Sequence, residues 1–130
     1  MHKIFVYGTL RPGTGETVRI PGIMFDLGWY PGVVAVNDPH WRDAEFASLR
    51  PMFTAEIIEV DDAELARLDD YEGYRPGDNE NSLYRRIHYE DGFLYEYNRS
   101  VGNRPRVSSG DWLAYTQQKE GCNAGIHSRR

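Results

Sequence analysis

A glycine-containing loop near the start of the chain carries residues that could bind a ligand. An apolar run at residues 4–7 ends at Gly8, and the segment 7–13 reads Tyr-Gly-Thr-Leu-Arg-Pro-Gly. Successive main-chain N–H groups in such a turn can converge on an anion or a polarised carbonyl, and glycine lets a ligand approach the backbone closely. Strands that end in a glycine turn are also common as plain structure, so both interpretations stay open. The segment lacks the Gly-Lys-Ser/Thr ending of a Walker loop.

A second chemically competent segment, residues 68–74, holds three carboxylates at the predicted end of a helix: Asp69, Asp70 and Glu72. A helix C-terminus carries partial negative charge, which normally favours basic side chains. Crowding carboxylates there disfavours ionisation and raises the affinity of one of them for a proton. Glu72, flanked by tyrosines, is our candidate for proton transfer near neutral pH. Alternatively, all three carboxylates point into water or are neutralised by the downstream arginines Arg75, Arg85 and Arg86.

Other common catalytic patterns do not occur in the sequence. The four histidines lack metal-ligand spacing, and neither an HExxH motif nor a GxSxG elbow is found. The single cysteine, Cys122, excludes an internal disulfide and leaves Cys-rich zinc sites without ligands. We therefore predict a site without metal and without a cysteine nucleophile.

Length and composition indicate one folded domain. The chain has 130 residues, of which 40% are hydrophobic and 13% aromatic, which is too rich in core-forming side chains for disorder. A net charge of −5 gives no general attraction to nucleic acid, and the aromatic residues do not alternate with a basic patch. No stretch approaches the roughly 18 apolar residues of a membrane helix, and no signal-peptide pattern opens the chain. We expect a cytoplasmic protein that binds neither membrane nor nucleic acid.

The bases are mostly arginine, and many lie in the second half of the chain. Arginine suits fork-like binding of carboxylates. Compositional bias of the source genome explains the same excess, and the sequence does not choose between the two.

The clearest local signal is a short helix after the strand predicted at residues 53–60. Asp61 can cap its first turn, Glu64 completes a capping box, and Val60 can pack on Leu65. Gly73 and the Pro-Gly pair after it end the helix. The helix therefore delivers the carboxylates of residues 68–74 to its C-terminal end.

Strands account for most of the remaining chain. We expect strands at residues 4–7, 18–25 and 33–36, and the second of these is broken, bulged or at an edge because of Pro21-Gly22. We also expect a hairpin of residues 84–90 and 93–98, whose Asp91-Gly92 turn supplies positive φ angles. Residues 37–51 read as an irregular surface excursion, 111–115 as a last strand or turn, and 117–130 as a mobile tail after a domain of residues 1–116. The fold class is α+β, with a mixed or antiparallel sheet that can curl into a small barrel.

Several sequence blocks occur in a familiar order: 7–13 (Tyr-Gly-Thr-Leu-Arg-Pro-Gly), 27–33 (Leu-Gly-Trp-Tyr-Pro-Gly-Val), 60–65 (Val-Asp-Asp-Ala-Glu-Leu), 68–74 (Leu-Asp-Asp-Tyr-Glu-Gly-Tyr), 83–86 (Leu-Tyr-Arg-Arg) and 110–112 (Gly-Asp-Trp). Together they resemble the γ-glutamylcyclotransferase family, and more narrowly its AIG2-like and γ-glutamylaminecyclotransferase branch. The resemblance runs from Lys3 to about Tyr115. The chain departs from the family pattern in a short stretch after the first loop and in Ala55-Glu56, where Gly-Glu is common.

This resemblance implies a small mixed β-barrel with flanking short helices. It also implies an enzyme that releases 5-oxoproline from a γ-glutamyl-amine or related small γ-glutamyl conjugate, without cofactor or metal. Carried over to matching positions, Tyr7, Gly8, Thr9 and Leu10 bind the glutamyl group, and Glu72 is the catalytic acid/base. The substrate's α-amine attacks its own γ-carbonyl, so the enzyme supplies proximity and proton transfer. The loop N–H groups bind either the substrate carboxylate or the developing oxyanion.

Two other hypotheses stay open beside this one. The short stretch after the first loop and the uninterpreted residues 37–51 also suit a non-catalytic member of the family, which keeps the pocket as a small-ligand sensor or presents the fold as an interaction module. A different acyl-transfer or lyase reaction could also use the same base. The retained glutamate at position 72 favours an enzyme over a binding module.

Overall fold

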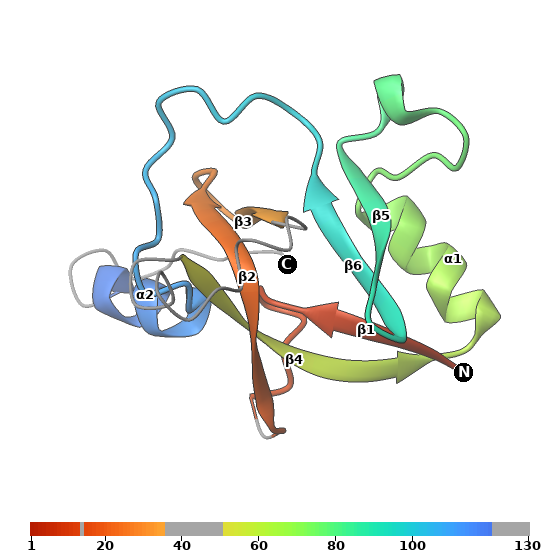
Figure 1. The fold of residues 1–130 in the computed structure, drawn as a ribbon, viewed down its shortest axis with the longest axis horizontal. Coiled ribbons are helices and arrows are strands. Elements are labelled where there is room, and N and C mark those ends of the chain that lie inside the picture. Colours follow the sequence, from red (N-terminus) through yellow and green to blue (C-terminus); the bar gives the residue numbers. More distant parts are fainter. Residues whose placement is uncertain (14, 36–50, 121–130) are drawn as a thin grey trace.

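A single curled sheet organises the computed structural model, which describes residues 1–13, 15–35 and 51–120. The elements are β1 (His2–Val6), β2 (Thr17–Asp26), β3 (Pro31–Ala35), β4 (Met52–Val60), α1 (Asp62–Tyr71), the 3-10 turn η3 (Asn79–Asn81), β5 (Tyr84–Tyr89), β6 (Gly92–Tyr97) and α2 (Trp112–Glu120). The strand order is β3-β2-β4-β1-β6-β5. Helix α1 lies beside the β5–β6 end of the sheet, and α2 lies at the opposite end of the molecule (Figure 1).

Strand β1 runs through the middle of the molecule and is buried on both faces. Ile4 and Val6 belong to one hydrophobic cluster, whereas Phe5 and Tyr7 belong to the other. The strand is antiparallel to β4 and parallel to β6, with the register Ile4↔Phe93 and Phe5↔Leu94 in the parallel pair. An apolar run without alternation is what a strand buried on both faces requires. The loop that follows β1 is therefore anchored in the core.

Strand β2 is continuous, although Pro21 predicts a break. Its first half pairs with β4 as far as Pro21↔Met52, and its second half pairs with β3 from Gly22↔Ala35 onward. Each half therefore has a different antiparallel partner, and the exchange falls at the Pro-Gly pair. Proline lacks an N–H for a sheet ladder, which makes it suited to this exchange point.

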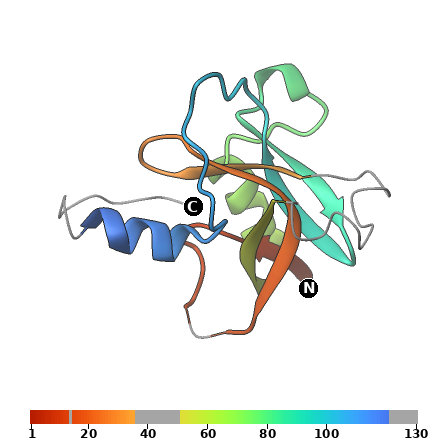
Figure 2. The ribbon, with the colours of Figure 1, turned by 60° about the vertical axis from the view of Figure 1, so that its left-hand side comes forward.

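Contacts of β3 with β5 and β6 curl the sheet toward a barrel. The Ala35 N–H donates to the Glu96 carboxylate at 2.8 Å, and the Tyr84 hydroxyl donates to the Pro31 carbonyl at 2.7 Å. Strand β3 is at one edge of the sheet order and still lies against β6, which the second view makes visible (Figure 2). The result is a mixed half-barrel with two short helices, and the predicted α+β fold class is confirmed.

The predicted helix is present as α1. Asp61 caps it by accepting a hydrogen bond from the Glu64 N–H at 2.8 Å. Val60 and Leu65 are buried in the same hydrophobic cluster, as the predicted packing across the first turn requires. The helix ends at Tyr71 with Glu72 as its C-cap.

The hairpin of β5 and β6 is confirmed, but its turn was assigned one residue too late. Tyr89 pairs with Gly92, so the turn residues are Glu90 and Asp91, and the non-glycine residue with positive φ is Glu90 at 51°. Gly92 belongs to β6, where a Cβ atom would lie 2.5 Å from the Lys3 carbonyl oxygen. Glycine is required there by the close approach of β1, not by the turn.

The last strand or turn predicted at residues 111–115 is wrong, because these residues begin helix α2. Asp111 accepts a hydrogen bond from the Ala114 N–H at 3.2 Å and so caps the helix. Asp111 is a typical helix-capping residue, but the sequence that follows it shows no clear apolar period of a helix. Helix α2 extends to Glu120, so residues 117–120 of the predicted tail are helical. Residues 36–50 and 121–130 lie outside the described part of the chain, and for them the irregular excursion and the mobile tail stay predictions.

Candidate active site

The loop after β1 forms a tight turn at the end of the central strand. The Arg11 N–H donates to the Gly8 carbonyl at 3.1 Å, which closes a four-residue turn. This hydrogen bond uses neither the Thr9 nor the Leu10 N–H. Thr9 is exposed at the tip of the turn, and Leu10 is half-buried.

A buried ion pair holds the continuation of this loop. The Arg11 Nε donates to the Glu56 Oε2 at 2.8 Å, and the two side chains are only 6% and 1% exposed. The same carboxylate accepts hydrogen bonds from the N–H groups of Gly13 and Gly15 at 3.1–3.2 Å. Arg11 also donates to Asp111 Oδ1 at 2.9 Å. Glu56 thus anchors the loop to β4, and its role is structural.

The electrostatics of Glu56 agree with that role. Burial by itself would raise the pKa of this carboxyl, but the hydrogen bond from Arg11 and those from Gly13 and Gly15 outweigh it and hold the pKa below the usual 4.5. Glu56 is therefore ionised at neutral pH. A charged carboxylate is the form that can hold Arg11 and the loop N–H groups together.

Glu72 lies on the inside of the molecule, opposite the first loop. It is 3% exposed and lines a cavity of about 10 Å³. The other residues that line this cavity are Phe5, Val6, Tyr7, Gly8, Leu10 and Tyr95. A hollow of this volume holds about one water molecule. The two segments singled out in the sequence, some sixty positions apart, therefore meet at one enclosed point.

The three carboxylates at the end of α1 have three different surroundings. Asp70 is exposed, as the water-facing alternative predicts. Asp69 accepts hydrogen bonds from Arg86 at 2.7 Å and from the Tyr95 hydroxyl at 2.6 Å, as the neutralised alternative predicts. Only Glu72 faces the cavity with the loop. Glu72, the residue selected for proton transfer, is buried, so the water-facing alternative does not describe it.

Tyr95 forms the wall that connects these groups. Its main-chain oxygen accepts a hydrogen bond from the Tyr7 hydroxyl at 2.6 Å, and its own hydroxyl donates to Asp69. Burial and the hydrogen bond to Asp69 raise the pKa of Tyr95 far above its usual value of 10, and the nearby Glu72 charge adds to this. Tyr95 is thus a fixed, protonated hydroxyl beside the cavity.

Of the predicted site residues, Tyr7, Gly8, Leu10 and Glu72 line one cavity, whereas Thr9 lies outside it. Sequence reasoning missed Tyr95 as a cavity residue and Glu56 as the anchor of the loop. A charged residue within the apolar strand β4 was the available signal for Glu56. Tyr95 had no such signal, because it follows Phe93 and Leu94 in a strand whose residues are all buried or half-buried.

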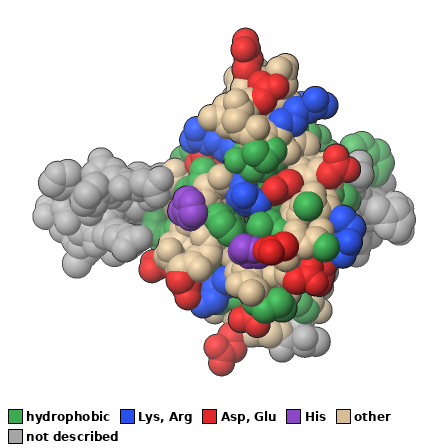
Figure 3. Space-filling model, turned by 90° about the vertical axis from the view of Figure 1, so that its right-hand side faces the viewer, with side chains coloured by type: hydrophobic (Ala, Val, Ile, Leu, Met, Phe, Trp, Pro, Cys, Tyr) green, Lys and Arg blue, Asp and Glu red, His purple; other side chains and the backbone are tan. Residues whose placement is uncertain are grey.

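Charges on the surface around α1 and β5 do not form a patch of one sign. The face in Figure 3 mixes acidic, basic and hydrophobic side chains. Among the described residues, no group of three or more His, Cys, Asp or Glu side chains is placed to hold a metal ion. Within the same residues, no helix has the length and apolar character needed to cross a membrane.

Solved structures share this architecture. An uncharacterized protein from Pyrococcus horikoshii, PH0828, superposes with a TM-score of 0.63 at 19% identity, over 95% of this chain and 99% of the other. The solution structure of protein ytfP from Escherichia coli superposes with a TM-score of 0.53 at 25% identity, over 88% of this chain and 98% of the other. The curled half-barrel is therefore a known fold.

Sequence comparisons identify the family. The profile described as "Gamma-glutamyl cyclotransferase, AIG2-like" matches residues 4–114. The γ-glutamylcyclotransferase family protein YtfP of Escherichia coli K12 is 28% identical over 85% of this chain and 96% of its own length. The γ-L-glutamyl-butirosin B γ-glutamyl cyclotransferase of Niallia circulans is 31% identical over 91% of this chain and 80% of its own length. The chain belongs to the γ-glutamylcyclotransferase family of enzymes, as its sequence blocks indicated, and the family implies a small γ-glutamyl substrate.

Proposed function

We propose that this protein releases 5-oxoproline from a γ-glutamyl-amine, with Glu72 as the general acid and base. The observation that carries the proposal is that Glu72, 3% exposed, lines the same cavity as Tyr7, Gly8 and Leu10. The relative named for γ-L-glutamyl-butirosin B supports the choice of an amine as leaving group. The proposal includes a cytoplasmic location and independence from any cofactor.

The reaction needs one proton carrier and one anion site. The Glu72 carboxylate takes a proton from the substrate's α-ammonium group, and the free amine attacks the γ-carbonyl carbon to close a five-membered ring. As the bond to the leaving nitrogen breaks, Glu72 returns the first proton to that nitrogen. The ring nitrogen loses its second proton, which the released amine takes up, so 5-oxoproline and a protonated amine leave and no water is consumed. The N–H groups of Thr9 and Leu10, which the turn's own hydrogen bond does not use, stabilise the oxyanion or hold the α-carboxylate.

The cavity of about 10 Å³ is smaller than a glutamyl group, so the substrate must displace the side chains that close it. Among the loop residues that line the cavity, Leu10 is half-buried, and we expect its side chain to move. Because Glu72 is only 3% exposed, bulk water has little access to it, which favours ring closure over hydrolysis.

The test is 5-oxoproline release from a panel of γ-glutamyl-amines by wild type and Glu72→Gln. We expect the substitution to lower kcat by about 10²–10⁴-fold, the usual contribution of a general acid or base. Asp70→Asn is the matched control, because Asp70 is an exposed carboxylate at the same end of α1, and it should retain wild-type activity. The same panel in a thermal-shift assay checks the alternative: compounds that stabilise the protein and emerge unchanged would make it a binding module.

A further inference from the structure

A larger hollow lies directly beside the cavity that contains Glu72. It is a groove of about 410 Å³, within the usual size of small-molecule sites. Leu10 lines both hollows. On the helix side, Tyr71 lines the groove and the next residue, Glu72, lines the cavity. The groove is therefore the neighbouring space into which a substrate at Glu72 can extend once Leu10 moves.

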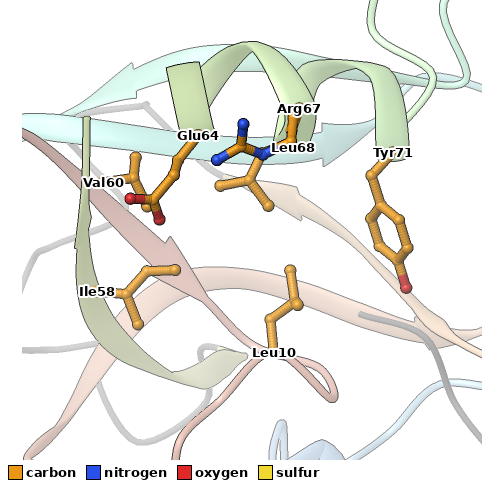
Figure 4. Close-up of a pocket in the computed structure, with 7 residues that line it drawn as sticks. All are labelled: Leu10, Ile58, Val60, Glu64, Arg67, Leu68 and Tyr71. Atoms are coloured by element: carbon orange, nitrogen blue, oxygen red, sulfur yellow. The ribbon is translucent and has the colours of Figure 1, made fainter. Parts of the chain in front are cut away.

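The groove has a mainly aliphatic lining that includes two charged side chains, Glu64 and Arg67. Its lining residues are Leu10, Ile58, Val60, Glu64, Arg67, Leu68 and Tyr71. Figure 4 shows Tyr71 at one end, Leu10 and Leu68 facing each other in the middle, and Glu64 at the end near Val60. The Arg67 guanidinium lies beside Leu68, between Glu64 and Tyr71. The end next to Glu72 is thus lined by Tyr71 and Leu10, and Glu64 lies at the other end.

We propose that this groove binds the substituent of the leaving nitrogen and selects an unbranched aliphatic amine; this inference rests on the proposed function. With the γ-carbonyl at Glu72, the leaving nitrogen lies near Leu10, and its substituent continues between Leu10 and Leu68. An alkyl chain gains free energy from burial there. A γ-glutamyl-α-amino acid places a carboxylate next to that nitrogen, against the apolar side chains of Leu10 and Leu68, where loss of water costs a carboxylate more than an alkyl group.

The length of the groove sets the expected specificity. Tyr71 and Glu64 are seven residues apart on α1, which corresponds to about 10 Å along the helix axis. Each methylene buried over that distance should raise kcat/KM by about fourfold, the equivalent of about 0.8 kcal/mol. Because the gain is made equally in substrate and transition state, it should lower KM and leave kcat unchanged.

The experiment measures 5-oxoproline release from γ-glutamyl-methylamide, γ-glutamyl-propylamide, γ-glutamyl-hexylamide and γ-glutamyl-alanine. For wild type we expect kcat/KM to be at least tenfold higher for the hexylamide than for the methylamide, and lowest for γ-glutamyl-alanine. Glu64→Trp, which fills the far end of the groove, should lower the hexyl-to-methyl ratio at least threefold. The matched control is Ala66→Trp, on an exposed position of α1 that does not line the groove, and it should leave the ratio unchanged.

Two failures are distinguishable in this series. If no amide yields 5-oxoproline, the proposed function fails and this inference fails with it. If the amides are turned over but the rate does not depend on chain length, or γ-glutamyl-alanine is preferred, the groove does not bind the leaving group. Calorimetry with Glu72→Gln adds a readout without turnover: at least tenfold tighter binding of the hexylamide than of the methylamide supports the groove, and equal affinities overturn it.

Discussion

Glu56→Gln is the most informative perturbation of this fold, because it removes a buried charge without changing the shape of the side chain. Glu56 and Arg11 are 1% and 6% exposed, and removing one member of a buried pair costs about 3–5 kcal/mol. Glutamine keeps one acceptor oxygen and Arg11 keeps Asp111, so we expect the lower end, about 3 kcal/mol. For 130 residues at about 2.1 cal/mol/K each, this corresponds to a fall in Tm of about 11 °C.

The loss should depend on pH in a defined direction. The pKa of Glu56 is lower in the folded protein than its usual 4.5, so its contribution to stability is fully present above that value. It disappears as the pH falls through the lower, folded-state pKa, where the wild-type side chain becomes protonated and resembles glutamine. The difference in unfolding free energy between wild type and Glu56→Gln should therefore be constant from neutral pH to about pH 5 and shrink below it.

Urea denaturation followed by tryptophan fluorescence measures this difference at each pH. The control is Glu59→Gln, because Glu59 is exposed on the same strand, and it should change the free energy of unfolding by less than about 0.5 kcal/mol. Equal stability of wild type and Glu56→Gln at neutral pH would refute the proposed anchoring of the loop. A difference that persists unchanged in acid would refute its electrostatic origin.

Two further predictions test the cavity wall and the motif at residues 110–112. Tyr95→Phe should destabilise the protein by about 1–2 kcal/mol, because the Asp69 carboxylate loses a hydrogen bond of 2.6 Å. Folding raises the pKa of Tyr95, so the difference in stability between wild type and Tyr95→Phe should shrink above pH 10. Urea denaturation across alkaline pH measures both effects. Gly110→Ala should cost at least about 3 kcal/mol, since its Cβ would lie 2.0 Å from the Met52 carbonyl oxygen. Gly102→Ala is the control with positive φ and nothing within 4 Å, and it should cost only about 1–2 kcal/mol; equal losses would show that backbone strain alone explains Gly110.

Local signals predicted the elements that depend on neighbouring residues. The capping of α1 by Asp61 was readable because the donor and acceptor are three residues apart. The hairpin of β5 and β6 was readable from its two apolar runs. Its turn was misplaced because Gly92 is required by the close approach of β1, almost ninety positions earlier, and not by the turn. Helix α2 was missed for a related reason: packing on the core, more than a regular apolar period, decides which of its side chains are buried.

The sequence by itself determined the two segments that we propose for the chemistry. The loop at residues 7–13 and Glu72 were recognisable because glycine turns, carboxylates and the order of family blocks are properties of the chain. Tertiary structure decided what each group does there. Asp69, Asp70 and Glu72 are chemically alike and adjacent, but only folding assigns one to Arg86 and Tyr95, one to water and one to the cavity. Burial and hydrogen-bond partners come from residues distant in sequence, and they set the charge and accessibility of a carboxylate.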